Sequence, residues 1–194
     1  MLKQLLQAYP KDVKVAFKQY PLAFHQYARG AAIAAVIAQR QNKFWEMHDL
    51  LFQNQRALDA PSLRRYAETI ALDMAAYDKG VSDPEVARVV DQEIQDAQKA
   101  GAMGTPTVFV NGVQSPSYAL ETLKRLVDVT LAGGDLSLEA GKILAEVRAA
   151  QARNRTPQPV APDYNKVYEI DTVGSPSRGP AGAPVTIVVF SDYQ

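Results

Sequence analysis

The stretch that most constrains this fold is a run of β-branched and aromatic residues, VTIVVF, at positions 185–190 of a 194-residue chain. Its apolar side chains form a nearly continuous run and do not alternate with polar ones. Such a run is typical of a strand that is buried on both faces, as in the middle of a sheet. The pattern suits the beginning of a domain, yet it lies at the end of this chain.

Composition narrows the function classes. Lys plus Arg and Asp plus Glu number 21 each, so the chain carries no net field that would attract nucleic acid or an anionic membrane surface. The longest apolar stretch, GAAIAAVIA at residues 30–38, is too short to span a membrane. We therefore expect neither nucleic acid nor membrane as a partner. The N-terminus of the chain as given shows no secretory signal.

The pattern along the chain predicts an α/β protein. A helical stub at residues 2–9 precedes a strand at 13–17, and helical periodicity extends from residue 25 to residue 100. The stretch TVFVNGV at residues 107–113 predicts a strand and a hairpin, because Asn-Gly is a strong hairpin signal. Helices follow at residues 120–127 and 137–152. A proline-rich linker at 153–165 and a short strand at 166–170 come next.

Three stretches together resemble the DsbA-like thiol-disulfide oxidoreductases. GTPTVFVNG (104–112) is similar to their cis-proline loop and hairpin, FWEMHDLLFQNQ (44–55) to their helical insertion, and GPAGAPVTIVVFSDYQ (179–194) to the segment before their Cys-x-x-Cys motif. The resemblance implies a thioredoxin-like fold with a DsbA-type helical insertion. It also implies a parent protein that is a protein disulfide oxidoreductase or isomerase, acts on extended or unfolded polypeptides and works in the periplasm or another extracytoplasmic compartment.

The order of these stretches is reversed relative to that family. We therefore expect a segment of a tandem-domain protein: residues 1–135 as the body of one domain, 136–165 as a helix and linker, and 166–194 as the head of a second domain. The body would hold the insertion at 23–101 and the cis-proline loop and hairpin at 104–115. A Cys-x-x-Cys motif would lie just outside each end.

The resemblance also implies a place for the apolar run. In a thioredoxin sheet the strand before the redox motif is central, between the equivalents of residues 13–17 and 108–110. Residues 166–194 are expected to complete the sheet of the preceding domain. This closure occurs either within one chain, as a circular permutation, or between two chains, as a domain-swapped homodimer.

The chain contains no cysteine, which excludes disulfide exchange by this segment alone. What remains is the substrate side, where the family's cis-proline loop offers backbone hydrogen bonds to an extended peptide. By resemblance, Thr105 and Pro106 are the candidate substrate-binding residues, with Pro106 in the cis form. The family's buried glutamate, six residues before the first cysteine, is replaced by Val189. Asp192 is interpreted as a solvated turn residue; the alternative is a charge that raises the pKa of a nearby thiol.

The sequence gives little indication of metal binding, nucleotide binding or hydrolysis. His25 and His48 lack the spacing of a zinc site, and no nucleotide-binding or hydrolase motif is present, so we expect no metal, no cofactor and no catalytic residue in this chain. Two alternatives to the oxidoreductase hypothesis stay open. One is a redox-inactive peptide-binding or scaffolding domain. The other is the glutathione-dependent kappa or hydroxychromene isomerase branch, for which the sequence offers no identifiable glutathione site.

Overall fold

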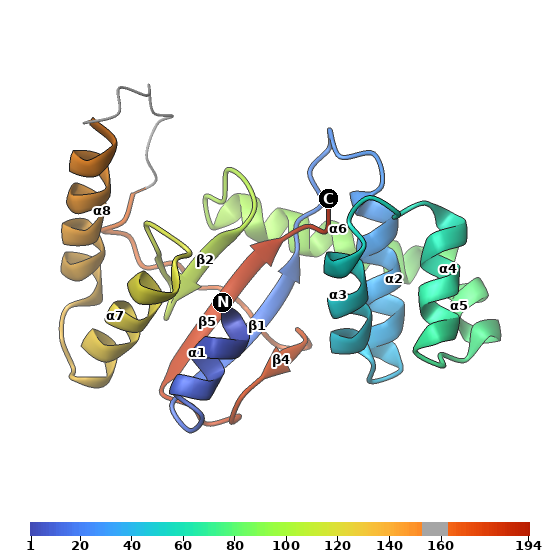
Figure 1. The fold of residues 1–194 in the computed structure, drawn as a ribbon, viewed down its shortest axis with the longest axis horizontal. Helices are drawn as coiled ribbons and strands as arrows, with labels where there is room; N and C mark the ends of the chain where they lie inside the picture. The colour runs from blue at the N-terminus through green and yellow to red at the C-terminus, as the bar shows by residue number, and fades with distance from the viewer. Residues whose placement is uncertain (153–162) are drawn as a thin grey trace. The chain divides into compact units, whose positions relative to one another are not determined.

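The computed structural model describes residues 1–152 and 163–194. Within them the chain divides into two compact units, one of mixed α/β structure and one helical (Figure 1). Unit 1 consists of Met1–Phe17 and Pro106–Val189, and unit 2 of Lys18–Thr105 and Phe190–Gln194. Residues 153–162 of the predicted linker lie outside the described residues.

The sheet has five strands in the order β3-β2-β5-β1-β4. Their bounds are β1 (Val13–Gln19), β2 (Thr107–Val110), β3 (Val113–Gln114), β4 (Ser177–Arg178) and β5 (Val185–Ser191). The helices of unit 1 are α1 (Leu2–Ala8), α7 (Leu120–Leu131) and α8 (Leu136–Ala152). This is the mixed α/β architecture that the sequence predicts.

The apolar run forms β5, which lies between β2 and β1. At its first residue Val185 N donates to Asp12 O at 3.0 Å, and at its last residue Ser191 O accepts from Tyr20 N at 2.8 Å. These two hydrogen bonds make β5 and β1 parallel. Both edges of β5 are thus paired, and every residue of the strand except Thr186 is buried, as expected for a strand with so few polar side chains.

The predicted hairpin is confirmed between β2 and β3, where Phe109 pairs with Gln114. Its turn residues Asn111 and Gly112 both have positive φ values, 43° and 81°, as a tight type I′ turn requires. A Cβ at Gly112 would lie 2.3 Å from the backbone oxygen of Tyr168, so only glycine fits there. The position therefore needs glycine for its conformation and for the close approach of another segment.

The prediction of a short strand at residues 166–170 is wrong. This segment makes one isolated bridge, Val167 with Val113, to which the hydrogen bond from Tyr168 N to Gly112 O at 2.8 Å belongs. The β3 strand beside it is only two residues long, so it offers too few backbone groups to pair with a longer strand.

Unit 2 contains α2 (Ala28–Arg40), α3 (Phe44–Gln53), α4 (Ala60–Thr69), α5 (Met74–Val81) and α6 (Pro84–Lys99). Aspartate side chains begin three of these helices by accepting a backbone N–H of the first turn: Asp59 for α4, Asp73 for α5 and Asp83 for α6. Pro84 is the first residue of α6, and Gly101 follows its end with a φ of 75°. A proline at the first helical position and a glycine just past the last one are usual signals of helix ends.

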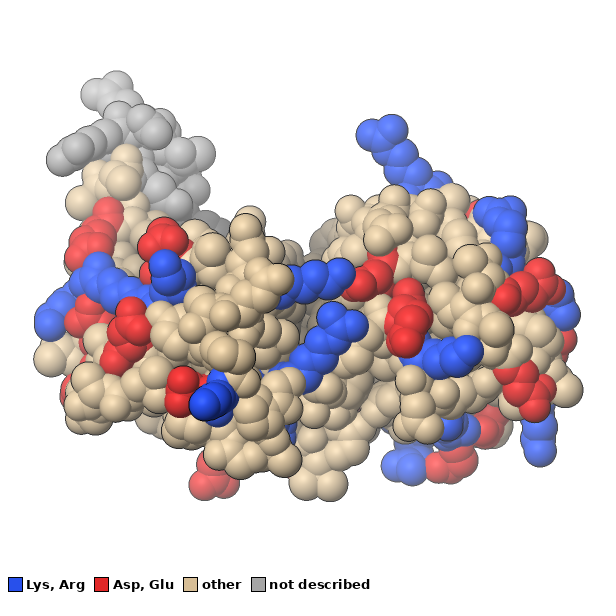
Figure 2. All heavy atoms as spheres, turned by 60° about the horizontal axis from the view of Figure 1, so that its bottom comes forward, with Lys and Arg blue, Asp and Glu red and all other residues tan. Residues whose placement is uncertain are grey.

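Basic and acidic side chains are interspersed on the parts of each unit that Figure 2 shows. This mixing agrees with the equal numbers of basic and acidic residues in the sequence. In the described parts of the chain, none of the helices combines the length and the apolar character needed to cross a bilayer.

Burial of β5 gives a direct test of this sheet. Val185 is fully buried, whereas Val173 is 89% exposed, so the same substitution by alanine can be compared at the two positions. Val185→Ala is expected to lower the free energy of unfolding by about 2 kcal/mol, and Val173→Ala by less than about 0.5 kcal/mol. Equilibrium denaturation measures both.

Closure within one chain, as opposed to exchange of β5 between two chains, stays a prediction, and light scattering on the same samples tests it. A monomer that loses stability with Val185→Ala supports closure within one chain. A stable dimer supports exchange. Equal stability of the two alanine variants contradicts the central position of β5.

Candidate functional site

The candidate site is the C-terminal cluster of unit 2, which we define as Asp192, Tyr193 and Gln194 together with the side chains that hold them. The segment directly follows β5, so the strand determines where these three residues lie. The hydrogen bonds that hold Asp192 and Gln194 connect residues of unit 2 that are far apart in the sequence.

Asp192 is the anchor of this cluster. Its side chain is only 3% exposed, and it accepts a hydrogen bond from Leu22 N at 3.1 Å. His25 Nδ1 lies 2.7 Å from the same carboxylate oxygen, and Thr105 Oγ1 donates to the other oxygen at 3.4 Å. The interpretation of Asp192 as a solvated turn residue is therefore wrong. Its partners are 87 to 170 residues away in the sequence, so no local pattern indicates them.

Tyr193 is fully buried, and its ring packs against Phe52 and His48 with centroid distances of 5.0 and 6.1 Å. Its backbone oxygen accepts from Gln55 Nε2 at 3.1 Å, and its hydroxyl lies 3.5 Å from Gln19 Nε2. Burial raises the pKa of this phenol well above its ordinary value, so it is neutral at physiological pH.

Gln194 is held by its side chain, because its Oε1 accepts from Tyr27 N at 2.9 Å. Asp192 and Gln194 are therefore held by the same loop, whereas Tyr193 packs against α3. The loop between β1 and α2 supplies Leu22, His25 and Tyr27. The direction of the chain at Gln194 is thus determined by packing and hydrogen bonds.

A buried carboxyl lies next to this cluster in the hydrogen-bond network. Glu93 is 8% exposed, and its Oε2 accepts from Gln19 N at 2.7 Å. Burial raises the pKa of Glu93 to about 7, while the N–H of Gln19 and then the charge of Lys18 oppose the shift. Tyr193 shares an electrostatic interaction with Glu93. Glu93 therefore exchanges a proton near neutral pH.

Lys18 and Asp96 form an ion pair beside Glu93, with Lys18 Nζ 2.8 Å from Asp96 Oδ2. Burial alone would raise the pKa of Asp96, but hydrogen bonds from Lys18 and Gln92 hold it below its ordinary value. Lys18 makes its hydrogen bond and ion pair with Asp96, so it stabilises the charge of Asp96 directly and opposes the raised pKa of Glu93 only in part. This division explains why only one of the two carboxyls titrates near neutrality.

Sequence reasoning missed Glu93. The sequence predicts an apolar stripe of Val86, Val90 and Ile94 along this helix, and a solvated face for the charged stretch DQEIQDAQK at residues 91–99. In the structure the buried residues of α6 are Val86, Val90, Glu93 and Ala97. The spacing 86, 90, 93, 97 follows the helical period, so an acidic residue at a stripe position was the available signal.

The two residues predicted to bind substrate lie at the junction before β2. Thr105 is half-buried and contacts Asp192 as described, whereas Pro106 is exposed. Their role in peptide binding stays a prediction. The two histidines have different surroundings. His25 contacts Asp192, whereas His48 packs among aromatic rings. Among the residues that the structure describes, no three His, Cys, Asp or Glu side chains gather as a metal site.

The family can be stated at this point. The profile of the DSBA-like thioredoxin domain matches residues 1–128, about two thirds of the chain. The chain belongs to this family. The resemblance found in the sequence and the thioredoxin-like fold are thereby confirmed.

The curated relatives that match this chain are named as Na(+)/H(+) antiporters and not as oxidoreductases. A Na(+)/H(+) antiporter NhaA 3 from Salinispora tropica is 36% identical over 143 residues, which cover 73% of this chain and 22% of the relative. A Na(+)/H(+) antiporter NhaA 1 from Salinispora arenicola is 36% identical over 63% of the chain and 19% of the relative. A Na(+)/H(+) antiporter NhaA from Herminiimonas arsenicoxydans is 31% identical, with coverages of 63% and 20%. The chain therefore spans about a fifth of these relatives. No solved structure matches significantly.

Glu93 makes the stability of the protein depend on pH. Its pKa is about 7 in the folded state and has a reference value of 4.5, so the folded state holds the proton more tightly. Stability is greatest below the unfolded-state pKa and is lost as the pH rises through about 7. Between about pH 5 and about pH 8 the loss is expected to be about 2 to 3 kcal/mol, and Glu93→Gln is expected to abolish it.

Denaturant unfolding followed by the fluorescence of Trp45, the single tryptophan, measures this effect at both pH values. Glu85→Gln on the same helix is the matched control, because the Glu85 side chain is exposed. An unchanged pH slope in Glu93→Gln would rule out Glu93 as its source.

Anchoring by Asp192 has a separate consequence. Asp192→Ala leaves the N–H of Leu22 without its acceptor and removes the partners of His25 and Thr105. The expected loss is about 1 to 3 kcal/mol, the cost of a buried unsatisfied polar group. Denaturant unfolding measures the loss, and Asp91→Ala is the control because Asp91 forms an exposed ion pair with Arg29. Equal losses in the two variants contradict the anchoring role.

Proposed function

We propose that this chain is the non-thiol part of a protein thiol-disulfide oxidoreductase or isomerase that acts on cysteines of extended or unfolded polypeptides. In this proposal the longer protein carries a Cys-x-x-Cys motif directly after Gln194 and works in the periplasm or another extracytoplasmic compartment. Membership in the DSBA-like family supports the reaction class. The observation that carries the proposal is the C-terminal cluster, which holds Asp192, Tyr193 and Gln194 in fixed positions.

The chemistry assigned to the longer protein is thiol-disulfide exchange. A thiolate attacks one sulfur of a disulfide, a new S–S bond forms as the old one breaks, and the leaving thiolate takes up a proton. The chain described here supplies no sulfur for this step. It supplies surroundings that favour it: a buried acid, Glu93, that titrates near neutral pH, and a position beside Thr105 for an extended peptide.

Glu93 has a specific place in this proposal. The strand position at which related proteins often carry a buried glutamate is occupied by Val189, which is buried in β5. Glu93 provides a buried carboxyl from α6 in place of that residue. Its hydrogen bond with Gln19 N and its electrostatic interaction with Tyr193 connect it to the segment that leads to Gln194.

The test uses the longer protein with its natural residues after Gln194. Refolding of a reduced, unfolded polypeptide with several cysteines is expected to proceed faster with this protein than with glutathione buffer alone. Glu93→Gln is expected to shift the pH profile of exchange by removing a group with a pKa of about 7, and Glu85→Gln to leave it unchanged. The 194-residue chain itself is expected to show no exchange. Absence of a Cys-x-x-Cys motif at both junctions contradicts the proposal.

A second candidate function is a redox-inactive domain that binds peptides or serves a larger protein as a scaffold. Two observations favour it: the absence of cysteine and the antiporter names of relatives of which this chain spans about a fifth. Peptide binding by the 194-residue chain that weakens with Pro106→Ala, combined with no exchange by the longer protein, supports this second candidate over the first.

A further inference from the structure

Gln19, the last residue of β1, has a buried polar atom without a hydrogen-bond partner. The residue is only 1% exposed, and among the described residues nothing donates to its side-chain oxygen Oε1. A buried carbonyl oxygen without a donor is costly, and native structures keep few of them. This oxygen therefore marks a place where a hydrogen-bond donor would stabilise the folded protein.

Two titratable groups already contact Gln19. Its backbone N–H donates to Glu93 Oε2 at 2.7 Å, and its side-chain Nε2 lies 3.5 Å from the hydroxyl of Tyr193. Glu93 and Tyr193 are both buried, and they also interact electrostatically. Three buried polar side chains, from β1, α6 and the C-terminal cluster, thus lie together, and Gln19 contacts the other two.

Protonation of Glu93 supplies a donor of the kind that this oxygen needs. A charged carboxylate only accepts hydrogen bonds, whereas a protonated carboxyl has one O–H to donate. Burial raises the pKa of Glu93 to about 7, so both forms are populated near neutral pH. The O–H of the protonated form requires an acceptor, and Gln19 Oε1 is the one buried side-chain acceptor without a donor among the described residues of unit 2.

The charged groups that face Glu93 oppose one another. Lys18 on β1 lowers the pKa of Glu93, but its ammonium group makes its hydrogen bond with Asp96 Oδ2 at 2.8 Å. Asp96 lies one turn further along α6, and its charge raises the pKa of Glu93. The C-terminal cluster presents the neutral phenol of Tyr193. Because the two charges act in opposite directions, one hydrogen bond to the protonated carboxyl has a measurable effect on its titration.

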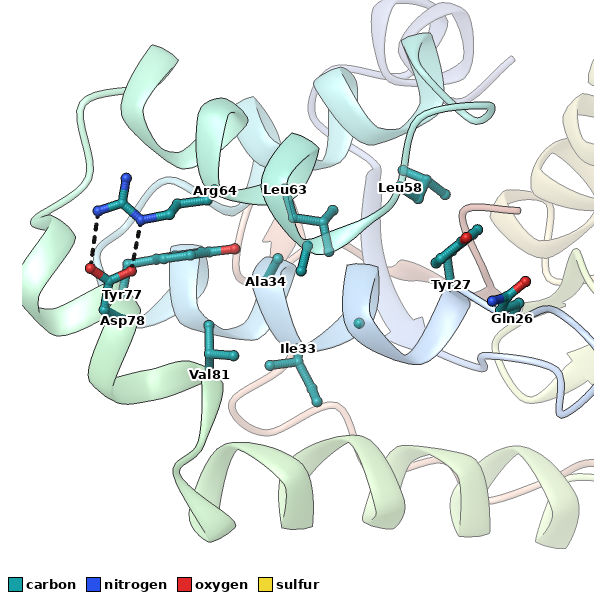
Figure 3. A pocket seen from close by; sticks show the side chains of 12 residues that line it. Gln26, Tyr27, Ile33, Ala34, Leu58, Leu63, Arg64, Tyr77, Asp78 and Val81 are labelled. Atoms are coloured by element: carbon teal, nitrogen blue, oxygen red, sulfur yellow. Dashed lines mark hydrogen bonds and ion pairs between the residues drawn. The ribbon is translucent and has the colours of Figure 1, made fainter.

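The apolar pocket of unit 2 does not provide a donor for this oxygen. The pocket has a volume of about 440 Å³ and lies among α2, α4 and α5 (Figure 3). Neither Gln19 nor Glu93 is among the residues that line it. Solvent in this pocket therefore does not reach Gln19 Oε1, which favours a partner from the buried groups around it.

We propose that Gln19 is a positioning residue that links the protonation of Glu93 to the C-terminal cluster. Protonated Glu93 donates its O–H to Gln19 Oε1, and Gln19 Nε2 donates to the hydroxyl of Tyr193. The two groups of the amide are conjugated, so an oxygen that accepts makes the N–H a stronger donor. The proton stays on Glu93, and only the strength of the second hydrogen bond changes. This inference rests on the proposed function, since Tyr193 lies in the segment that leads to the reactive groups of the longer protein.

Gln19→Met removes the amide and keeps a side chain of similar length. Loss of the acceptor disfavours protonated Glu93, so the midpoint of its titration is expected to fall by about 0.5 to 1 pH unit. An effect of burial alone would raise the midpoint, so the direction separates the two roles. Gln114→Met is the matched control. Gln114 also has a buried side-chain oxygen without a partner among the described residues, but it lies on β3 in unit 1, and the midpoint is expected to stay unchanged.

NMR spectroscopy of the 194-residue chain labelled with ¹³C and ¹⁵N measures the titrations directly. The signals are the carboxyl carbon of Glu93, the side-chain amide of Gln19 and the phenol carbon of Tyr193. In the wild type all three are expected to change with one midpoint near neutral pH. In Gln19→Met the Tyr193 signal should lose most of its dependence on pH, while Glu93 still titrates. The wild-type titrations test the proposal even if Gln19→Met does not fold.

A side-chain amide of Gln19 that does not follow the titration of Glu93 overturns the proposal. So does a Glu93 midpoint that is unchanged or raised in Gln19→Met. An undiminished Tyr193 signal in this variant also overturns it, since the charge of Glu93 then acts on Tyr193 directly. In the longer protein Gln19→Met should move the pH profile of exchange in the same direction as the midpoint of Glu93. Because the titrations involve no thiol, a longer protein without exchange overturns only the oxidoreductase function, and failed titrations with exchange intact overturn only the role of Gln19.

Discussion

The interaction on which the rest of the structure depends is the pairing of β5 on both of its edges. This strand lies between β2 and β1, and its residues up to Val189 belong to unit 1, with Val185 and Ile187 among the fully buried side chains. A strand this apolar is stable only where both faces and both edges are covered. The same stretch of chain then continues into unit 2 as Asp192, Tyr193 and Gln194. One segment therefore completes the sheet and also builds the candidate site.

The sequence predicts most elements of this fold because their signals are local. Alternation marks β1, Asn111 and Gly112 mark the hairpin, and an aspartate followed by proline marks the start of α6. Prediction from the sequence fails where an element depends on a partner that is distant in the sequence or on a pairing strand that is too short. Residues 166–170 have the composition of a strand, but β3 gives them too few backbone groups for pairing. Local composition indicates a preference, and the partner decides whether it is realised.

The candidate site was less predictable for the same physical reason. The local sequence around Asp192 is typical of an exposed turn. Its burial depends on Leu22, His25 and Thr105, which only the tertiary fold brings close to it. Glu93 was assigned to a solvent-facing segment because acidic residues are usually exposed. The helical period places it on the buried face of α6. A polar residue at a buried position is informative because it contradicts the simple pattern.

The cost of burying Glu93 is an argument for a functional role of this carboxyl. Glu93 is held in surroundings that disfavour its charge, although a neutral glutamine could accept the same N–H of Gln19. A glutamate is therefore not the choice that stability alone would make at this position. Glu93 lies in the unit that holds the C-terminal cluster, and its hydrogen bond to Gln19 N connects it to the residue whose side chain contacts Tyr193. A carboxyl that titrates near neutral pH is a group that acid–base chemistry can use.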